Sequence, residues 1–113
     1  MTRMKSVKGD SVTRLAESTQ RNASISFAML GDWGASEDQT LQFAVAKQLG
    51  TSCAVAACAA VISVGDNIYP KGVESSDDPL FRTVFEDVYT APSLQLPFYN
   101  SLGNHDYRSW AEA

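Results

Sequence analysis

Three apolar segments of this chain end in the same way, with a glycine followed at once by an aspartate or an asparagine. The three junctions read MLGD at residues 29–32, SVGD at residues 63–66 and SLGN at residues 101–104. Glycine lets the backbone turn sharply and come close to a bound group. The carboxyl ends of parallel strands meet at one edge of a sheet, where ligands gather. If the three segments are parallel strands, their polar side chains therefore converge on one site.

The apolar segments themselves predict three strands. We expect them at residues 25–30, 59–64 and 97–102, the last one weakened by Asn100 and Ser101. The middle segment is apolar at consecutive positions, which is typical of a parallel strand covered on both faces.

A helix is expected in each of the two connections. Ser36 followed by Gln39 matches a capping box and predicts the start of the first helix, with Gly50 at its end. Its apolar face would be Leu41, Ala44, Val45 and Leu49. The second helix would be capped by Asp77 or Asp78, with Pro79 at its first position. Its apolar stripe would be Leu80, Phe81, Val84, Phe85 and Val88.

The order strand–helix–strand–helix–strand predicts an α/β fold with parallel strands and right-handed crossovers. The chain has 113 residues, 44% of them hydrophobic, which suits one globular domain. Residues 1–23 are polar and read as a flexible tail, and residues 24–113 as the ordered domain. A net charge of −4 argues against a nucleic-acid binder. We also find no apolar run of transmembrane length and no legible signal peptide.

Two cysteines, Cys53 and Cys58, stand five residues apart in CAVAAC. This spacing fits neither the redox C-x-x-C motif nor a complete zinc site. We therefore expect two small buried apolar residues.

The three glycine junctions extend into longer motifs: Gly31-Asp32-Trp33-Gly34, Gly65-Asp66-Asn67-Ile68-Tyr69 and Gly103-Asn104-His105-Asp106. Each one alone is compatible with an ordinary turn. From average residue frequencies, a fixed four-residue pattern arises by chance in roughly 1 in 1,000 chains of this length. The combination of all three on one predicted sheet edge therefore favours a functional site.

GDWG, GDNIY and GNHD, in this order, resemble the motifs of the metallophosphoesterase (calcineurin-like) superfamily. The tyrosine and the following DDPLFRTVFEDVY are similar to its purple, or tartrate-resistant, acid phosphatase branch. The resemblance covers about residues 25–110. It implies the N-terminal βαβαβ half of a four-layer α/β/β/α sandwich, and a dinuclear centre of Fe(III) with Fe(II), Zn(II) or Mn(II).

The resemblance also implies roles for individual residues. Asp32 and Tyr69 would bind the ferric ion, Asp66 would bridge both ions, and Asn104 would bind the divalent one. Chemistry supports this assignment, because a phenol gives up its proton near neutral pH only beside a strong Lewis acid. Carboxylates and a phenolate are also hard oxygen ligands, which suit a trivalent cation.

Two further residues would act on the substrate. His105 would contact the phosphate of a phosphomonoester and assist its leaving group, while a metal-bound hydroxide attacks phosphorus. Asp106 would orient the imidazole of His105.

The chain contains one histidine, whereas the family pattern needs three more as ligands in later blocks, one of them G-H-x-H. We therefore expect this polypeptide alone to bind metal weakly and to hydrolyse esters slowly or not at all. A half sandwich would also expose an apolar sheet face, so a missing C-terminal half or a partner chain is expected. The alternative function is a non-catalytic truncated remnant or half-domain. The family suggests a secreted or lysosomal location, but no residue of this chain decides the compartment.

Overall fold

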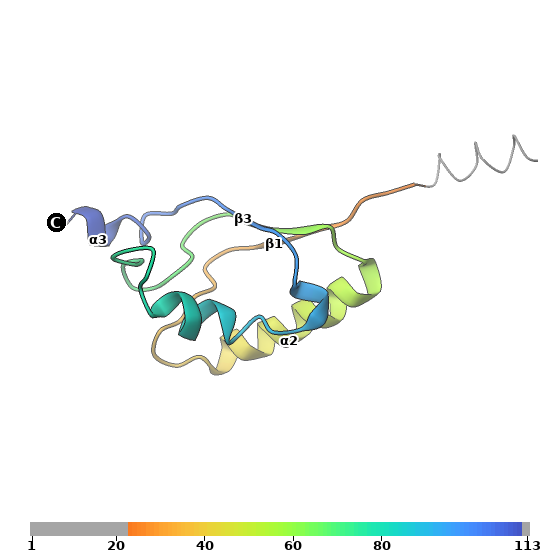
Figure 1. Ribbon diagram of the computed structural model, residues 1–113, viewed down its shortest axis with the longest axis horizontal. Coiled ribbons are helices and arrows are strands. Elements are labelled where there is room, and N and C mark those ends of the chain that lie inside the picture. The colour runs from red at the N-terminus through yellow and green to blue at the C-terminus, as the bar shows by residue number, and fades with distance from the viewer. Residues whose placement is uncertain (1–22, 112–113) are drawn as a thin grey trace, which may run out of the picture.

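The computed structural model describes residues 23–111 (Figure 1). The predicted tail therefore lies outside the described residues, apart from Ala23. Along the chain the elements are β1 (Phe27–Leu30), α2 (Thr40–Ala56), β2 (Ala60–Ser63), η1 (Phe81–Glu86), η2 (Pro92–Leu94), β3 (Phe98–Asn100) and α3 (Arg108–Ala111). The predicted strand–helix–strand–helix–strand order is confirmed, with strands shorter than the apolar segments that predict them.

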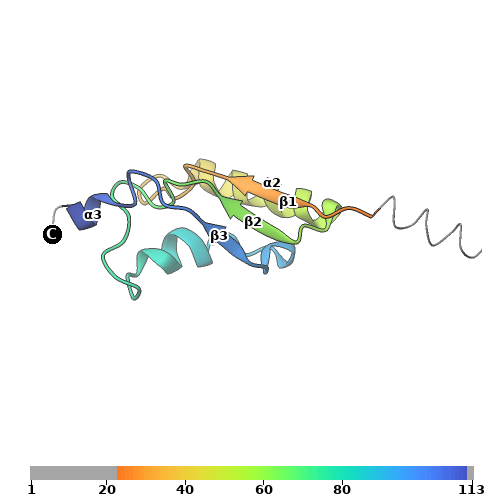
Figure 2. The same cartoon turned by 90° about the horizontal axis from the view of Figure 1, so that it is seen from above.

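The three strands form one parallel sheet in the order β1-β2-β3. Met29 lies beside Ile62, and Ile62 beside Tyr99. Because each crossover is right-handed and the strands are added in one direction, both connections fall on the same face of the sheet. Figure 1 shows α2 and the η1 turn on that side, and Figure 2 looks onto the opposite side.

Helix α2 differs from its prediction at both ends. It begins at Thr40, whose N–H donates to Asp38 Oδ1 (3.0 Å), and no side chain caps it at Gln39. The capping box is wrong because the Gln39 side chain donates instead to the Thr83 carbonyl (3.0 Å) and to Gln42. The helix also continues past Gly50 and ends at Ala56, followed by a C-cap residue, Ala57, with a left-handed backbone (φ 54°).

The buried face of α2 is not the predicted one. Its buried residues are Gln42, Ala46, Gly50 and Cys53, whereas Leu41 is 75% exposed. Gly50 serves close packing, because a Cβ there would lie 2.7 Å from the Cβ of Ala91. Small residues thus bring α2 against η2, and the larger aliphatic side chains face outward.

The second connection follows its prediction more closely. The N-cap of its helical turns is Leu80 and has no side-chain cap, so the predicted cap at Asp77 or Asp78 is wrong. The Asp78 carboxylate instead accepts hydrogen bonds from the N–H groups of Glu74 and Leu80 (both 2.9 Å). The following turns are π-helical over Phe81–Glu86, and Val84 and Val88 are buried.

Cys53 and Cys58 form a disulfide, so the expectation of two unlinked apolar residues is wrong. The bond joins the last turn of α2 to the residues just before β2. The left-handed Ala57 reverses the chain there, and the N–H of Cys58 donates to the carbonyl of Cys53 (3.3 Å). This reversal brings the two thiols together, which spacing alone does not reveal.

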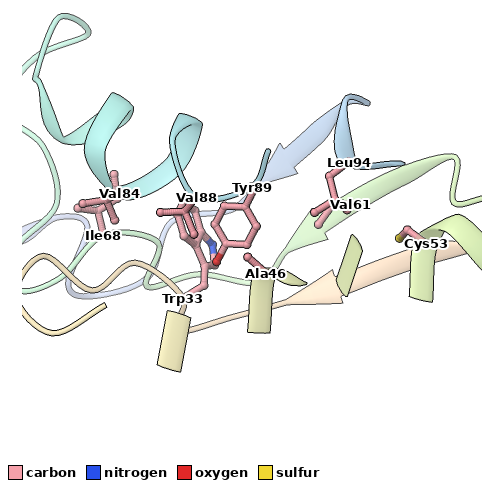
Figure 3. Packing of buried hydrophobic residues seen from close by; sticks show 9 residues of the cluster. All are labelled: Trp33, Ala46, Cys53, Val61, Ile68, Val84, Val88, Tyr89 and Leu94. Carbon is pink, nitrogen blue, oxygen red and sulfur yellow. The ribbon is translucent and has the colours of Figure 1, made fainter. Parts of the chain in front are cut away.

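The core lies between the sheet and its helical connections (Figure 3). Trp33 packs edge-on against Tyr89, with ring centroids 5.5 Å apart, and Phe85 packs edge-on against Phe98 at 4.8 Å. Val61 in the central strand is fully buried beneath them. Trp33 belongs to the first glycine motif, so the core reaches directly under the predicted site.

The other face of the sheet has no cover in the described part of the chain. Phe27, Met29 and Tyr99 on this face are 50%, 68% and 63% exposed, and Ile62 between them is half-buried. We call these four residues the open sheet face. The central strand is therefore covered on one face only, although its apolar sequence predicts cover on both. Among the described helices, none is long and apolar enough to cross a membrane.

Candidate metal centre

The three glycine motifs follow the three strands at one end of the sheet. Here the N–H of Asp32 donates to the carbonyl of Gly65 (3.1 Å), and the N–H of Ser101 donates to that of Ser63 (3.0 Å). We call the segments 31–36, 64–70 and 101–107 the strand-end loops. The parallel register brings them side by side, as the sequence predicts.

Two carboxylates and a phenol meet across these loops. The Tyr69 hydroxyl donates to Asp32 Oδ1 (2.6 Å) and lies 3.3 Å from Asp66 Oδ2. Tyr69 is half-buried and points at the carboxylates rather than into the aliphatic core. Two predicted metal ligands, Asp32 and Asp66, therefore lie within hydrogen-bonding distance of a third, the Tyr69 hydroxyl.

Both carboxylate residues have a left-handed backbone, with φ of 52° at Asp32 and at Asp66. This conformation costs an L-residue on the order of 1–2 kcal/mol. Strain of this kind clusters at functional sites, where the surrounding structure holds it in place. Here it turns each carboxylate out of its strand and toward Tyr69.

The third loop packs against Asp66. The N–H of His105 donates to Asp66 Oδ1 (2.9 Å), and a Cβ on Gly103 would collide with the same oxygen. Asn104 lies between these two residues and is exposed. Its backbone is therefore adjacent to the Asp66 carboxylate.

The His105 ring lies beside Tyr69, with ring centroids 4.5 Å apart. Its Nδ1 is 2.7 Å from the carbonyl oxygen of Pro70, so this carbonyl orients the imidazole. The hydrogen bonds do not support the predicted role of Asp106 as the orienting group. Its carboxylate points away into the protein and accepts from the N–H groups of Asn67 (2.9 Å), Ile68 (3.1 Å) and Gly103 (2.9 Å).

Three residues without a predicted role, Trp33, Ser63 and Asn67, link these loops through a buried network of hydrogen bonds. Trp33 Nε1 donates to Ser63 Oγ (2.8 Å) and to Asn67 Oδ1 (3.1 Å). Ser63 Oγ also donates to Asn67 Oδ1. Asn67 Nδ2 then donates to the Ser101 carbonyl (2.8 Å) and to Asp106 Oδ2 (3.0 Å). The only feature of the sequence that could have indicated this network is the polar residue Ser63 at the end of an apolar strand.

Electrostatics at the site favour a cation. The pKa of the Tyr69 phenol is raised well above its ordinary value of 10.0, first because the hydroxyl donates to Asp32, then through partial burial and the negative charges of Asp32 and Asp66. A proton thus bridges two carboxylates that would otherwise repel each other. A hard metal ion can replace that proton and use all three oxygens. The donor set therefore fits a hard cation that prefers oxygen ligands.

The described residues contain no cluster of three or more His, Cys, Asp or Glu side chains. The strand-end loops instead bring together two carboxylates and a phenol, with the exposed Asn104 next to them. The fold and these loops are compatible with an N-terminal half-domain of the metallophosphoesterase class.

Comparison with known proteins confirms the resemblance to purple acid phosphatases. The chain is 45% identical over 95 residues to purple acid phosphatase 3 of Arabidopsis thaliana and 43% identical over 109 residues to purple acid phosphatase 17 of the same plant. It is 34% identical over 86 residues to human tartrate-resistant acid phosphatase type 5. These matches cover 84%, 95% and 72% of this chain, but only 26%, 31% and 26% of the relatives.

A solved structure shares the fold as well. It is described as "GAP50 the anchor in the inner membrane complex of Plasmodium", with a TM-score of 0.67 and 31% identity. The match covers 77% of this chain and 27% of that one. No protein-family model matches the chain.

Proposed function

We propose that this chain forms part of a phosphomonoester hydrolase of the purple acid phosphatase type. One observation carries the proposal: the Tyr69 hydroxyl lies within hydrogen-bonding distance of the carboxylates of both Asp32 and Asp66. A diesterase of the same superfamily is the rival within the enzyme class, and a tyrosine in this position argues against it.

In this proposal Asp32 and Tyr69 hold a ferric ion. Asp66 has two carboxylate oxygens and bridges to a divalent ion, Fe(II), Zn(II) or Mn(II), and Asn104 adds a neutral oxygen on that side. When bound, the two ions supply Lewis acidity, which neutralises phosphate charge and makes a nucleophile from water. The family pattern has three further histidine ligands, which lie outside residues 1–113, in a C-terminal half or a partner chain.

His105 acts on the leaving group. Its Nδ1 faces the Pro70 carbonyl, so this nitrogen carries the hydrogen and Nε2 is left for the substrate. In the imidazolium form both ring nitrogens carry hydrogen, so Nε2–H donates a hydrogen bond or its proton to the leaving oxygen of the ester, and the ring is left neutral. Packing against Tyr69 keeps the ring next to the ferric ligands.

The open sheet face supports the view that the polypeptide is one half of a larger unit. Phe27, Met29 and Tyr99 present apolar surface that isolated proteins normally cover. We propose that the polypeptide supplying the missing histidines covers this face. The alternative, a non-catalytic half-domain, draws support from the similarity to a protein described as an anchor, but the ligand arrangement favours the hydrolase.

The test replaces the matching segment of Arabidopsis purple acid phosphatase 17 with this chain. We expect the chimaera to hydrolyse p-nitrophenyl phosphate at acidic pH with ferric and zinc ions supplied, and Asp66→Ala to abolish the activity. We also expect a visible absorbance band from the ferric tyrosinate that Tyr69→Phe removes. A folded chimaera without activity or band would contradict the proposal. Asp66-dependent activity in the isolated chain would contradict the need for outside histidines.

A further inference from the structure

The side chain of Asn67 is saturated with hydrogen bonds. Its Oδ1 accepts from Trp33 Nε1 and Ser63 Oγ, and its Nδ2 donates to the Ser101 carbonyl and to Asp106 Oδ2. Asn67 is 7% exposed, and its side-chain partners are also buried. A fully satisfied buried amide has one orientation, because rotation by half a turn would set donors against donors.

The partners of Asn67 come from all three strand-end loops. Trp33 follows Asp32 in the first loop, Asn67 itself follows Asp66 in the second, and Asp106 stands two residues after Asn104 in the third. Asp106 strengthens the link, because its carboxylate also accepts backbone N–H groups from both the second and the third loop. One buried network thus fixes the spacing of the residues that bear the predicted ligands.

Only an amide satisfies this arrangement. An aspartate at position 67 would set an oxygen against the Asp106 carboxylate and another carbonyl, where two donated hydrogen bonds now lie. The buried acceptors would lose their partners, and two negative charges would face each other in a desolvated place. The loops would then separate, although the strands beneath them need not change.

Resting on the proposed function, we infer that Asn67 is a positioning residue that holds the three loops at the spacing a metal pair requires. It acts through Asp106 and Trp33 and touches neither ion nor substrate. Residues beyond the ligands that orient them typically change metal affinity by roughly 10–100-fold when replaced.

The experiment compares Asn67→Asp with Val84→Ala in the full chain. Val84 is 1% exposed, so the control lowers stability through the core without entering the network. Each protein is titrated with ferric nitrilotriacetate, the visible tyrosinate band is followed, and affinity is corrected for the folded fraction. We expect Asn67→Asp to weaken ferric binding at least ~10-fold and to shift the band, and Val84→Ala to leave both unchanged. Equal effects in the two variants, or none in Asn67→Asp, would overturn the inference.

Hydrogen exchange in the metal-free chain separates this inference from the proposed function. A folded chimaera with Arabidopsis purple acid phosphatase 17 that shows no visible band would refute the ferric site. The positioning role is then decided by the N–H group of Gly103, which lies 36 residues from Asn67 in sequence but donates to Asp106. Loss of its protection in Asn67→Asp, but not in Val84→Ala, supports the role. Protection that survives overturns it.

Discussion

The disulfide between Cys53 and Cys58 gives a prediction whose size follows from the structure. It closes a loop of only six residues at the junction of α2 and β2. In the chain-entropy model a loop of this size stabilises the folded state by about 2 kcal/mol, because it restricts the unfolded chain. That is a sizeable part of the 5–15 kcal/mol that small domains typically have.

The double variant Cys53→Ala/Cys58→Ala removes this restriction. With a urea slope of ~1–3 kcal/mol/M for a small domain, we expect the unfolding midpoint to fall by roughly 0.7–2 M. Circular dichroism of the full chain in urea measures the shift. Reductant should lower the wild-type midpoint by a similar amount and leave the double variant unchanged.

Two results would refute this reasoning. Alkylation of both thiols in the unreduced, unfolded wild-type chain would show that the bond does not form. A double variant as stable as the oxidised wild type would show that the loop adds nothing. Because Cys53 is buried, alanine was chosen over serine to avoid adding an unpaired hydroxyl to the core.

The remaining predictions concern the site and the open sheet face. Gly103→Ala places a methyl group against the Asp66 carboxylate, so we expect roughly 1–3 kcal/mol of destabilisation by urea unfolding, together with weaker ferric binding. The raised pKa of Tyr69 means that its protonated hydroxyl stabilises the metal-free fold below pH 10.0, and that this contribution is lost as the pH rises through the raised value. The hydrogen bond to Asp32 is the main cause of the raised pKa of Tyr69, so in Asp32→Asn we expect tyrosinate absorbance to appear at a lower pH. Met29→Lys should reduce self-association of the isolated chain in sedimentation experiments, because Met29 is 68% exposed on the open sheet face.

Two of these predictions have a matched comparison. Val55→Lys changes an aliphatic residue that is 86% exposed on α2, so it should leave self-association unchanged. Tyr69→Phe identifies which part of the alkaline absorbance belongs to Tyr69. If Asp32→Asn moves that titration upward, or if Gly103→Ala is silent in both assays, the described contacts are wrong.

The sequence predicted the parallel sheet and the convergence of its three ends, because glycine junctions and strand order are local features. It also predicted that Asp32, Asp66 and Tyr69 converge, and the Tyr69 hydroxyl lies within hydrogen-bonding distance of both carboxylates. The buried face of α2 was mispredicted because hydrophobicity favours Leu41, whereas close packing selects Gly50. Hydrophobic periodicity does not show that α2 approaches Ala91 too closely for any residue other than glycine at position 50.

Other features depend on backbone conformation and tertiary contacts that the sequence does not show. The disulfide depends on the left-handed Ala57, and nothing in the residue type of an alanine announces that conformation. The role of Asn67 depends on partners up to 39 residues away, which meet only after the sheet has formed. Asp106 was assigned to its sequence neighbour His105, yet the backbone turns its carboxylate inward.

The open sheet face affects what becomes of the polypeptide after synthesis. A copy with this surface bare presents the same kind of apolar area that chaperones and proteases recognise in unfolded chains. The lifetime of such a copy then depends more on whether a partner covers the open sheet face than on how well its own core is packed.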